Sequence, residues 1–165
     1  MPFTPFHLGP ALALGALLRR RLHLPTLLLA SVLVDVEPLL VLLLDLAYPL
    51  HGYLHTFLGS LALGLLVGYT MYILERKLAP RLRPPSLERG CAGKRSFLIA
   101  GVAGTWLHVL LDSPLYSDIK PFYPAAANPL YNPSLAPYIY GLCLVSGAAG
   151  LALYFALLAC RFSTS

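Results

Sequence analysis

Two pairs of residues in this sequence combine types and spacing that can bind a metal ion. The first pair is His51 and His55, four residues apart in "HGYLH". The second is His108 and Asp112, four apart in "HVLLD". On an α-helix, residues at this spacing lie roughly 40° apart, so both members of a pair can face one point. Two such pairs on adjacent helices, with a carboxylate from a third, form the metal sites of helical bundles.

The third carboxylate is expected from an acidic pair inside a long apolar run, "SVLVDVEPLL". On an ideal helix Asp35 and Glu37 point roughly 200° apart. Pro38 disfavours helical geometry at Glu37, so we expect a break there that turns both carboxylates inward. An ionised carboxylate in hydrocarbon costs at least about 2.5–3.5 kcal/mol, and a divalent cation is the partner we expect. A proton or cation relay is the alternative.

The other ionisable residues have simpler interpretations. His7 is either a further ligand or a hydrogen-bonded packing residue. For the two spaced pairs, the alternative to a metal site is a hydrogen-bond network between helices. Asp45 is expected at a helix end near the membrane interface. His23 stands close to the arginines at 19–21 and is expected on the surface.

The composition predicts an all-α, polytopic integral membrane bundle. Of the 165 residues, 58% are hydrophobic and 12% charged, whereas soluble domains carry about 25% charge. We expect one membrane-embedded domain over residues 1–165, with membrane lipids as partners. The net charge of +5 does not predict nucleic-acid binding, because the basic residues flank apolar runs, as in membrane loops. The sequence makes no prediction of oligomeric state.

Three cysteines are present, and none forms a CxxC pair. Neither a disulfide framework nor a thiolate metal site is expected from this spacing. We expect Cys91, Cys143 and Cys160 to behave as small hydrophobic residues.

About five apolar helices are expected, of which the first is short for a span that needs about 20 residues. Gly59, Gly64 and Gly68 give the third a stripe of small residues for close packing. The five segments cover residues 7–18, 25–47, 54–74, 96–111 and 138–160.

Three basic clusters, Arg19–Arg21, residues 75–95 and Arg161, fix the expected orientation. Residues 75–95 are basic and are expected on the cytoplasmic side, whereas 113–137 are rich in proline and aromatic residues, typical of an interface. Alternating spans then put the N-terminus outside and the C-terminus inside the cytoplasmic membrane. Four of the five histidines, all but His23, and most acidic residues gather at the outer ends, so the site is expected toward the non-cytoplasmic face.

Three stretches, in chain order, resemble the membrane-bound metal-dependent hydrolase family, also described as LexA-binding, inner-membrane-associated hydrolases. They are "LLASVLVDVEP", "HGYLHTF" and "HVLLDSPLYSDIKPFYP". The chain departs from the family pattern at Val34 in place of proline, at Glu37 in place of aspartate, and in the four-residue histidine spacing. The residues that the resemblance implies as the metal site are His7, Asp35, Glu37, His51, His55, His108 and Asp112.

This family is distantly similar to zinc-dependent phospholipase C and P1 nuclease folds, which implies phosphoester hydrolysis by analogy. We therefore expect a hydrolase acting on a phosphoester of a lipid, or of another molecule near the outer leaflet. Nitrogen and oxygen ligands suit Zn²⁺, with Mn²⁺ or Fe²⁺ as alternatives. The metal would lower the pKa of a bound water toward about 7 and polarise the phosphoryl oxygen.

Individual roles follow from this expectation. Asp35 is both a ligand and a catalytic candidate, and Glu37 is either the general base or a residue that orients a ligand. Asp118 and Lys120 are expected to shape the entrance. Lys120 either faces a phosphate or marks the membrane interface.

Two other classes of protein stay open. One is a transporter or membrane metal-binding protein without catalysis. A transporter would show paired broken helices and an internal repeat, whereas the sequence shows one expected break and no repeat. The other is a structural membrane subunit, in which the histidines and acids would serve stability or association.

Overall fold

The computed structural model describes the backbone of residues 5–82 and 93–163 and most of their side chains. Within these ranges the chain is helical and contains no strand, so the all-α prediction is confirmed there. Single turns of 3-10 helix lie at Pro5–His7, Tyr53–His55 and Pro133–Leu135. The α-helices are α1 (Leu8–Leu17), α2 (Leu24–Leu33), α3 (Val36–Leu43), α4 (Phe57–Leu82), α5 (Lys94–Asp112) and α6 (Ala136–Ser163).

Three segments of the described chain are long and apolar enough to cross a membrane. They are Leu24–Leu43, which joins α2 and α3, Phe57–Leu78 within α4, and Pro133–Cys160, which includes most of α6. The ten residues of α1 extend only about 15 Å, half of a hydrocarbon core of about 30 Å. α5 is not among the three candidates. The structure thus supports a protein with several membrane-spanning helices, and three of the five expected segments meet the requirement.

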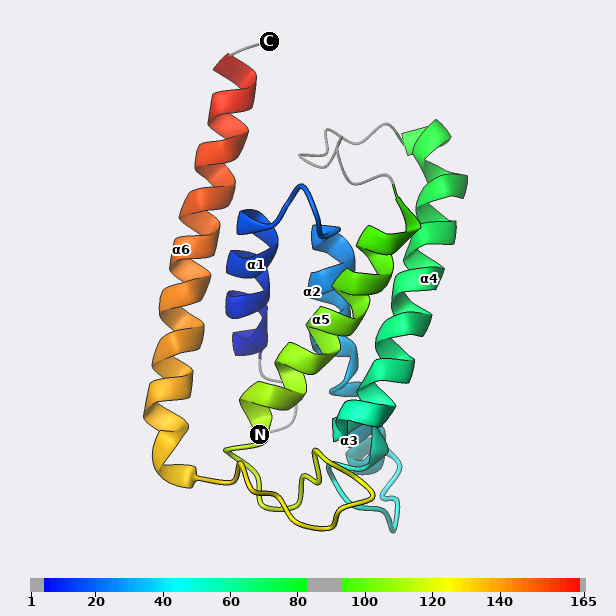
Figure 1. The fold of residues 1–165 in the computed structure, drawn as a ribbon, viewed down its shortest axis with the longest axis vertical. Coiled ribbons are helices and arrows are strands. Elements are labelled where there is room, and N and C mark those ends of the chain that lie inside the picture. The colour runs from blue at the N-terminus through cyan, green and yellow to red at the C-terminus, as the bar shows by residue number, and fades with distance from the viewer. Residues whose placement is uncertain (1–4, 83–92, 164–165) are drawn as a thin grey trace.

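α5 is the central helix, packed against α2 and α4, whereas α1 packs against α2 and α6 (Figure 1). α6 lies at one edge of the bundle (Figure 1), and many of its apolar side chains are exposed. The C-terminal end of α5, the α2–α3 junction and the start of α4 therefore meet at one end of the bundle.

Small residues let α4 and α5 approach each other closely, as the glycine stripe predicts. A Cβ added at Gly101 on α5 would collide with the carbonyl oxygen of Gly64 on α4. One added at Gly68 would lie 2.6 Å from the carbonyl oxygen of Phe97. Such backbone contact is how helices associate in lipid, where no hydrophobic driving force acts between them. Gly59 faces the backbone of Tyr53 instead of another helix.

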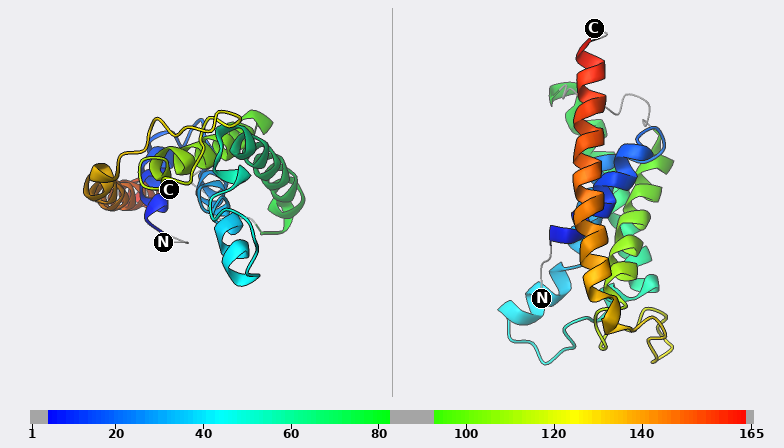
Figure 2. Two further views of the ribbon diagram at one scale, coloured as in Figure 1. Left: turned by 90° about the horizontal axis from the view of Figure 1, so that it is seen from below. Right: turned by 90° about the vertical axis from the view of Figure 1, so that its left-hand side faces the viewer.

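The break in the second span lies at Val34–Asp35, one turn before the position that we predicted at Glu37–Pro38. α3 begins at Val36, so Pro38 falls in its first turn, where proline is tolerated. Proline has no N–H to bond the carbonyl four residues earlier, and its ring crowds that carbonyl. For Pro38 that carbonyl belongs to Val34, so the helix is interrupted there and α3 leaves the line of α2 (Figure 2).

The basic loop differs from the expected 75–95. α4 continues as helix to Leu82 and α5 begins at Lys94. Glu, Arg, Lys and Leu are good helix formers, so the charged stretch extends the helix beyond its apolar part. Residues 83–92, including Cys91, lie outside the described residues. Of the other two cysteines, Cys143 is buried, as expected, and Cys160 is exposed.

His23 is not on the surface, so that prediction is wrong. Its side chain is 4% exposed and its ring stacks on Phe97 with centroids 4.1 Å apart. Nδ1 lies 2.7 Å from Oγ1 of Thr26, and Nε2 lies 2.7 Å from Oε2 of Glu75. α4 and α5 enclose the ring because Glu75 and Phe97 lie at the same end of the bundle as the start of α2.

Candidate metal centre

Four buried side chains meet at the end of the bundle opposite the arginines at 19–21. Asp35, His55, His108 and Asp112 each offer one ligand atom, and these atoms all lie within 4.8 Å of one another. Asp35 comes from the α2–α3 break, His55 from the 3-10 turn before α4, and the other two from the last turns of α5. The helix break, the 3-10 turn before α4 and the end of α5 thus each contribute to a group that could hold a metal ion.

His108 is held by a backbone carbonyl. Its Nδ1 lies 2.7 Å from the carbonyl oxygen of Ser31, which can only accept, so Nδ1 carries the proton. Nε2 lies 3.2 Å from Asp112 Oδ2 and 3.4 Å from Asp35 Oδ1, without hydrogen-bond geometry to either. A neutral ring would direct its Nε2 lone pair at two carboxylates. Either a second proton or a shared cation is needed between these groups.

His55 shows the same pattern with a different partner. Its Nδ1 lies 3.1 Å from Oε2 of Glu37, and its buried Nε2 has no hydrogen-bond partner. Metal-binding histidines commonly donate the other ring N–H to a carboxylate or a backbone carbonyl. Burial lowers the pKa of His55, although the Glu37 carboxylate opposes this shift. The neutral ring, which is the form that binds a metal, is therefore favoured at neutral pH.

Glu37 is occupied by several donors. Its carboxylate accepts from the backbone N–H groups of Gly52 at 3.0 Å and Leu54 at 3.1 Å, and from the Tyr48 hydroxyl at 3.2 Å. Burial raises the pKa of Tyr48, which keeps this hydroxyl protonated and donating. With His55 as a fourth partner, Glu37 fits the orienting role that we expected as an alternative to the general base. It fixes the loop that carries His55.

His7 lies beside the four residues but outside the group. Its side chain is 6% exposed, and Nε2 lies 3.1 Å from Asp112 Oδ1. Its ring centroid is 4.3 Å from that of His108, and its buried Nδ1 has no hydrogen-bond partner. His7 therefore contacts a member of the group through Asp112 and brings a further buried imidazole nitrogen next to it.

His51 does not share one helix face with His55, so the structural basis of that prediction is wrong. Residues 50 and 51 form bends, Tyr53–His55 is a 3-10 turn, and α4 begins only at Phe57. The two rings still meet edge to face, with centroids 4.7 Å apart. Nδ1 of His51 lies 2.9 Å from Asp118 Oδ2, so this ring is held by the loop between α5 and α6 and lies outside the four-residue group.

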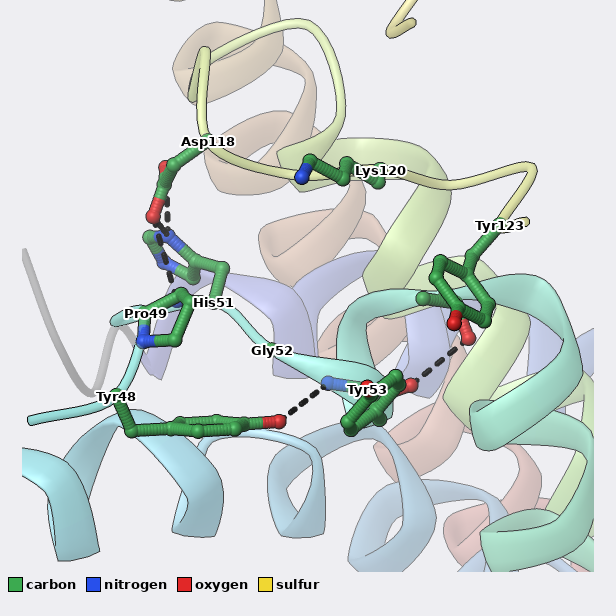
Figure 3. Close-up of a pocket in the computed structure, with 9 residues that line it drawn as sticks. Tyr48, Pro49, His51, Gly52, Tyr53, Asp118, Lys120 and Tyr123 are labelled. Carbon is green, nitrogen blue, oxygen red and sulfur yellow. Dashed lines mark hydrogen bonds and ion pairs between the residues drawn. The ribbon is translucent and has the colours of Figure 1, made fainter. Parts of the chain in front are cut away.

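A pocket of about 190 Å³ opens beside His51 (Figure 3). Asp118 and Lys120 line it, as expected for residues that shape an entrance. Tyr116 packs against the other side of His51, with ring centroids 4.5 Å apart. Burial raises the pKa of Tyr116 to about 12, so its hydroxyl stays protonated. Asp45 is exposed at the end of α3, away from these residues, as predicted.

Three contributors to this site were not predicted: Ser31, Tyr48 and Tyr116. Ser31 precedes Asp35 by four residues, so the helical spacing that singled out the other pairs would also have placed it on the same face. Ser31 contributes its backbone carbonyl, however, and because every residue has one, residue type does not predict this role. The two tyrosines lie in loops, where spacing does not determine direction.

No protein-family model, curated protein or solved structure matches this chain. The description of the site therefore rests on the geometry given above.

Proposed function

We propose that this protein is a membrane-embedded, metal-dependent hydrolase of phosphoesters. The observation that carries the proposal is the state of two buried imidazole nitrogens. Nε2 of His55 and Nε2 of His108 both lack hydrogen-bond partners, in a cluster that also holds two carboxylates. Buried polar atoms are rarely left unpaired, because an unmade hydrogen bond costs about 1–3 kcal/mol. A divalent cation would satisfy both nitrogens and both carboxylates together.

The donor set favours Zn²⁺, with Mn²⁺ or Fe²⁺ as alternatives. Two imidazoles and two carboxylates provide the nitrogen and oxygen ligands that zinc accepts, and the described part of the cluster contains no thiolate. A metal ion bound there supplies Lewis-acid polarisation of a phosphoryl oxygen and lowers the pKa of a coordinated water.

The chain's own residues prepare this chemistry. The Ser31 carbonyl and the Glu37 carboxylate each hold one imidazole with its Nε2 directed at the cluster. Asp35 and Asp112 provide the negative charge that balances a cation. Asp112 is held by both His7 and His108, whereas Asp35 lies 3.4 Å from His108. We therefore assign to Asp35 the catalytic role of accepting a proton from an attacking water.

Hydrolysis, rather than binding alone, is supported by the ordered motifs that resemble the membrane-bound metal-dependent hydrolases. The phosphoester class follows from the same resemblance. We place the site toward the non-cytoplasmic face of the cytoplasmic membrane, because the α1–α2 connection, which contains Arg19–Arg21, and the start of α5 at Lys94 lie at the opposite end of the bundle (Figure 1). A substrate at or near the outer leaflet, with a lipid as the first candidate, follows from this orientation.

The break between α2 and α3 favours one second candidate, a metal transporter or non-catalytic metal-binding protein. Transporters place ion sites at interrupted helices near acidic residues. Asp35 lies at such an interruption. Release of phosphate from a model substrate separates this candidate from the hydrolase, because only a hydrolase turns over.

Metal content is the deciding measurement. The detergent-purified protein is expected to contain stoichiometric zinc, manganese or iron by plasma mass spectrometry, and Asp112→Asn is expected to fall to background. Asp45→Asn is the matched control, because Asp45 is an exposed acid at the same end of the molecule. Background metal in well-folded wild type, even after metal is added back, would overturn the proposal. Activity is then assayed with 4-nitrophenyl phosphate and a short-chain phospholipid.

A further inference from the structure

The pocket beside the metal centre is built by two loops that are distant in the sequence. Residues 48–56 form one side and residues 118–123 form the other (Figure 3). The backbone N–H of Phe57 donates to the Pro121 carbonyl at 2.8 Å, which joins the first turn of α4 to the second loop. His51 lines the pocket and also contacts the ring of His55, so it is the wall between the pocket and the four-residue cluster.

The two charged residues in this pocket, Asp118 and Lys120, differ in whether they have hydrogen-bond or ion-pair partners. Asp118 accepts from Nδ1 of His51, which lies 3.0 Å from Oδ1 and 2.9 Å from Oδ2, and its Oδ2 also lies 3.3 Å from the backbone N–H of His51. The ammonium group of Lys120 has no ion pair or hydrogen bond with any described residue. Lys120 is therefore the charge in the pocket that is left for a ligand.

Lys120 is exposed, as a lysine that only marks the membrane interface also is, and what separates the two interpretations is the pocket in whose wall it lies. An interfacial lysine extends along apolar surface into the headgroup region. Lys120 instead follows Asp118 in the wall of a concave pocket, and Tyr53 and Tyr123 meet edge to face at the same pocket, with ring centroids 5.4 Å apart. A lysine ammonium provides three donors and a compact positive charge, which suits the oxygens of a phosphate group.

We infer that this pocket binds a phosphate group through Lys120, next to the metal centre. That the phosphate belongs to the substrate rests on the proposed function, whereas the binding itself does not. The group is supplied either by a lipid headgroup or by free phosphate. Lys120 would then hold the anionic part of the substrate while the adjoining cluster acts on its ester bond.

Calorimetry on chelator-treated protein in detergent tests the inference without metal. The probes are dihexanoyl phosphatidic acid and inorganic phosphate. A charge-assisted contact contributes about 1.5–3 kcal/mol, so Lys120→Gln is expected to weaken binding about tenfold or more. Lys120→Arg keeps the charge and is expected to retain most of the affinity. Lys94→Gln is the control, because Lys94 lies at the other end of the bundle over the ring of Tyr69.

The outcomes separate the two proposals. Binding of the phosphatidic acid alone supports a lipid headgroup, binding of inorganic phosphate alone supports a free phosphate, and Lys120-dependent binding of both supports recognition of the phosphate group that the two share. Equal affinity in Lys120→Gln and wild type, or no binding of either probe to folded wild type, would overturn the inference. Metal content is measured on the same preparations before the chelator is added. If phosphate binding depends on Lys120 but the wild type contains no metal, the phosphate site is supported and the hydrolase proposal is rejected. If the wild type contains metal but binding does not depend on Lys120, the phosphate site is rejected and the hydrolase proposal is unaffected.

Discussion

Buried histidines occur at both ends of this bundle, and they differ in how their nitrogens are satisfied. At the arginine-rich end, His23 has a partner for each ring nitrogen and stacks on Phe97. At the opposite end, His55 and His108 each have one partnered nitrogen and one buried nitrogen without a hydrogen bond. Burial alone therefore does not distinguish a packing histidine from a candidate ligand. A buried ring nitrogen that lacks a hydrogen bond and lies beside carboxylates does make this distinction.

The largest expected effect is the difference in metal affinity between His108→Ala, in the four-residue cluster, and His23→Ala, at the arginine-rich end. His108→Ala removes a ligand and is expected to reduce affinity for Zn²⁺ by more than about 100-fold, since even residues that only support a ligand cost 10–100-fold. His23→Ala is expected to leave that affinity unchanged. Competition with a chromogenic chelator measures both. Equal losses in the two variants would mean that zinc binding depends on general stability and would remove the distinction between the two ends.

A smaller effect is expected from Glu37→Gln, which keeps the shape of the side chain and removes its charge. The amide supports the His55 N–H less well, so Zn²⁺ affinity is expected to fall about 10–100-fold. The same titration measures it, with Asp45→Asn as the matched control. Unchanged affinity would show that the Glu37 carboxylate only stabilises the loop, through the N–H groups of Gly52 and Leu54, and does not affect metal binding by His55.

The smallest effects are expected at the arginine-rich end and concern stability. His23→Ala leaves the buried Thr26 hydroxyl without its partner and is expected to lower the free energy of unfolding by about 1–3 kcal/mol. Glu75 is half exposed, so Glu75→Gln is expected to cost less than about 1 kcal/mol. Denaturation in detergent measures both. A loss of metal in either variant would contradict the assignment of His23 as a packing residue.

Much of the helical architecture was predictable from the sequence. Long apolar runs marked the three candidate spans, because apolar length is what a bilayer requires. The spacing of His108 and Asp112 predicted that both lie on one face of α5, and in the structure Nε2 of His108 lies 3.2 Å from Oδ2 of Asp112. A break near Asp35 was also predictable from Pro38, although its position was one turn too late.

What only the tertiary structure decided is which of these side chains meet. Spacing along a helix fixes the angle between two neighbours, but whether a nitrogen has a partner depends on segments that are distant in the chain. His51 and His55 look equivalent in the sequence. In the structure His51 contacts Asp118, whereas His55 contacts Glu37 and belongs to the four-residue cluster. His23 was expected on the surface because only its neighbours in sequence were considered. Its burial depends on Glu75 and Phe97, which reach it only when α4 and α5 pack beside α2.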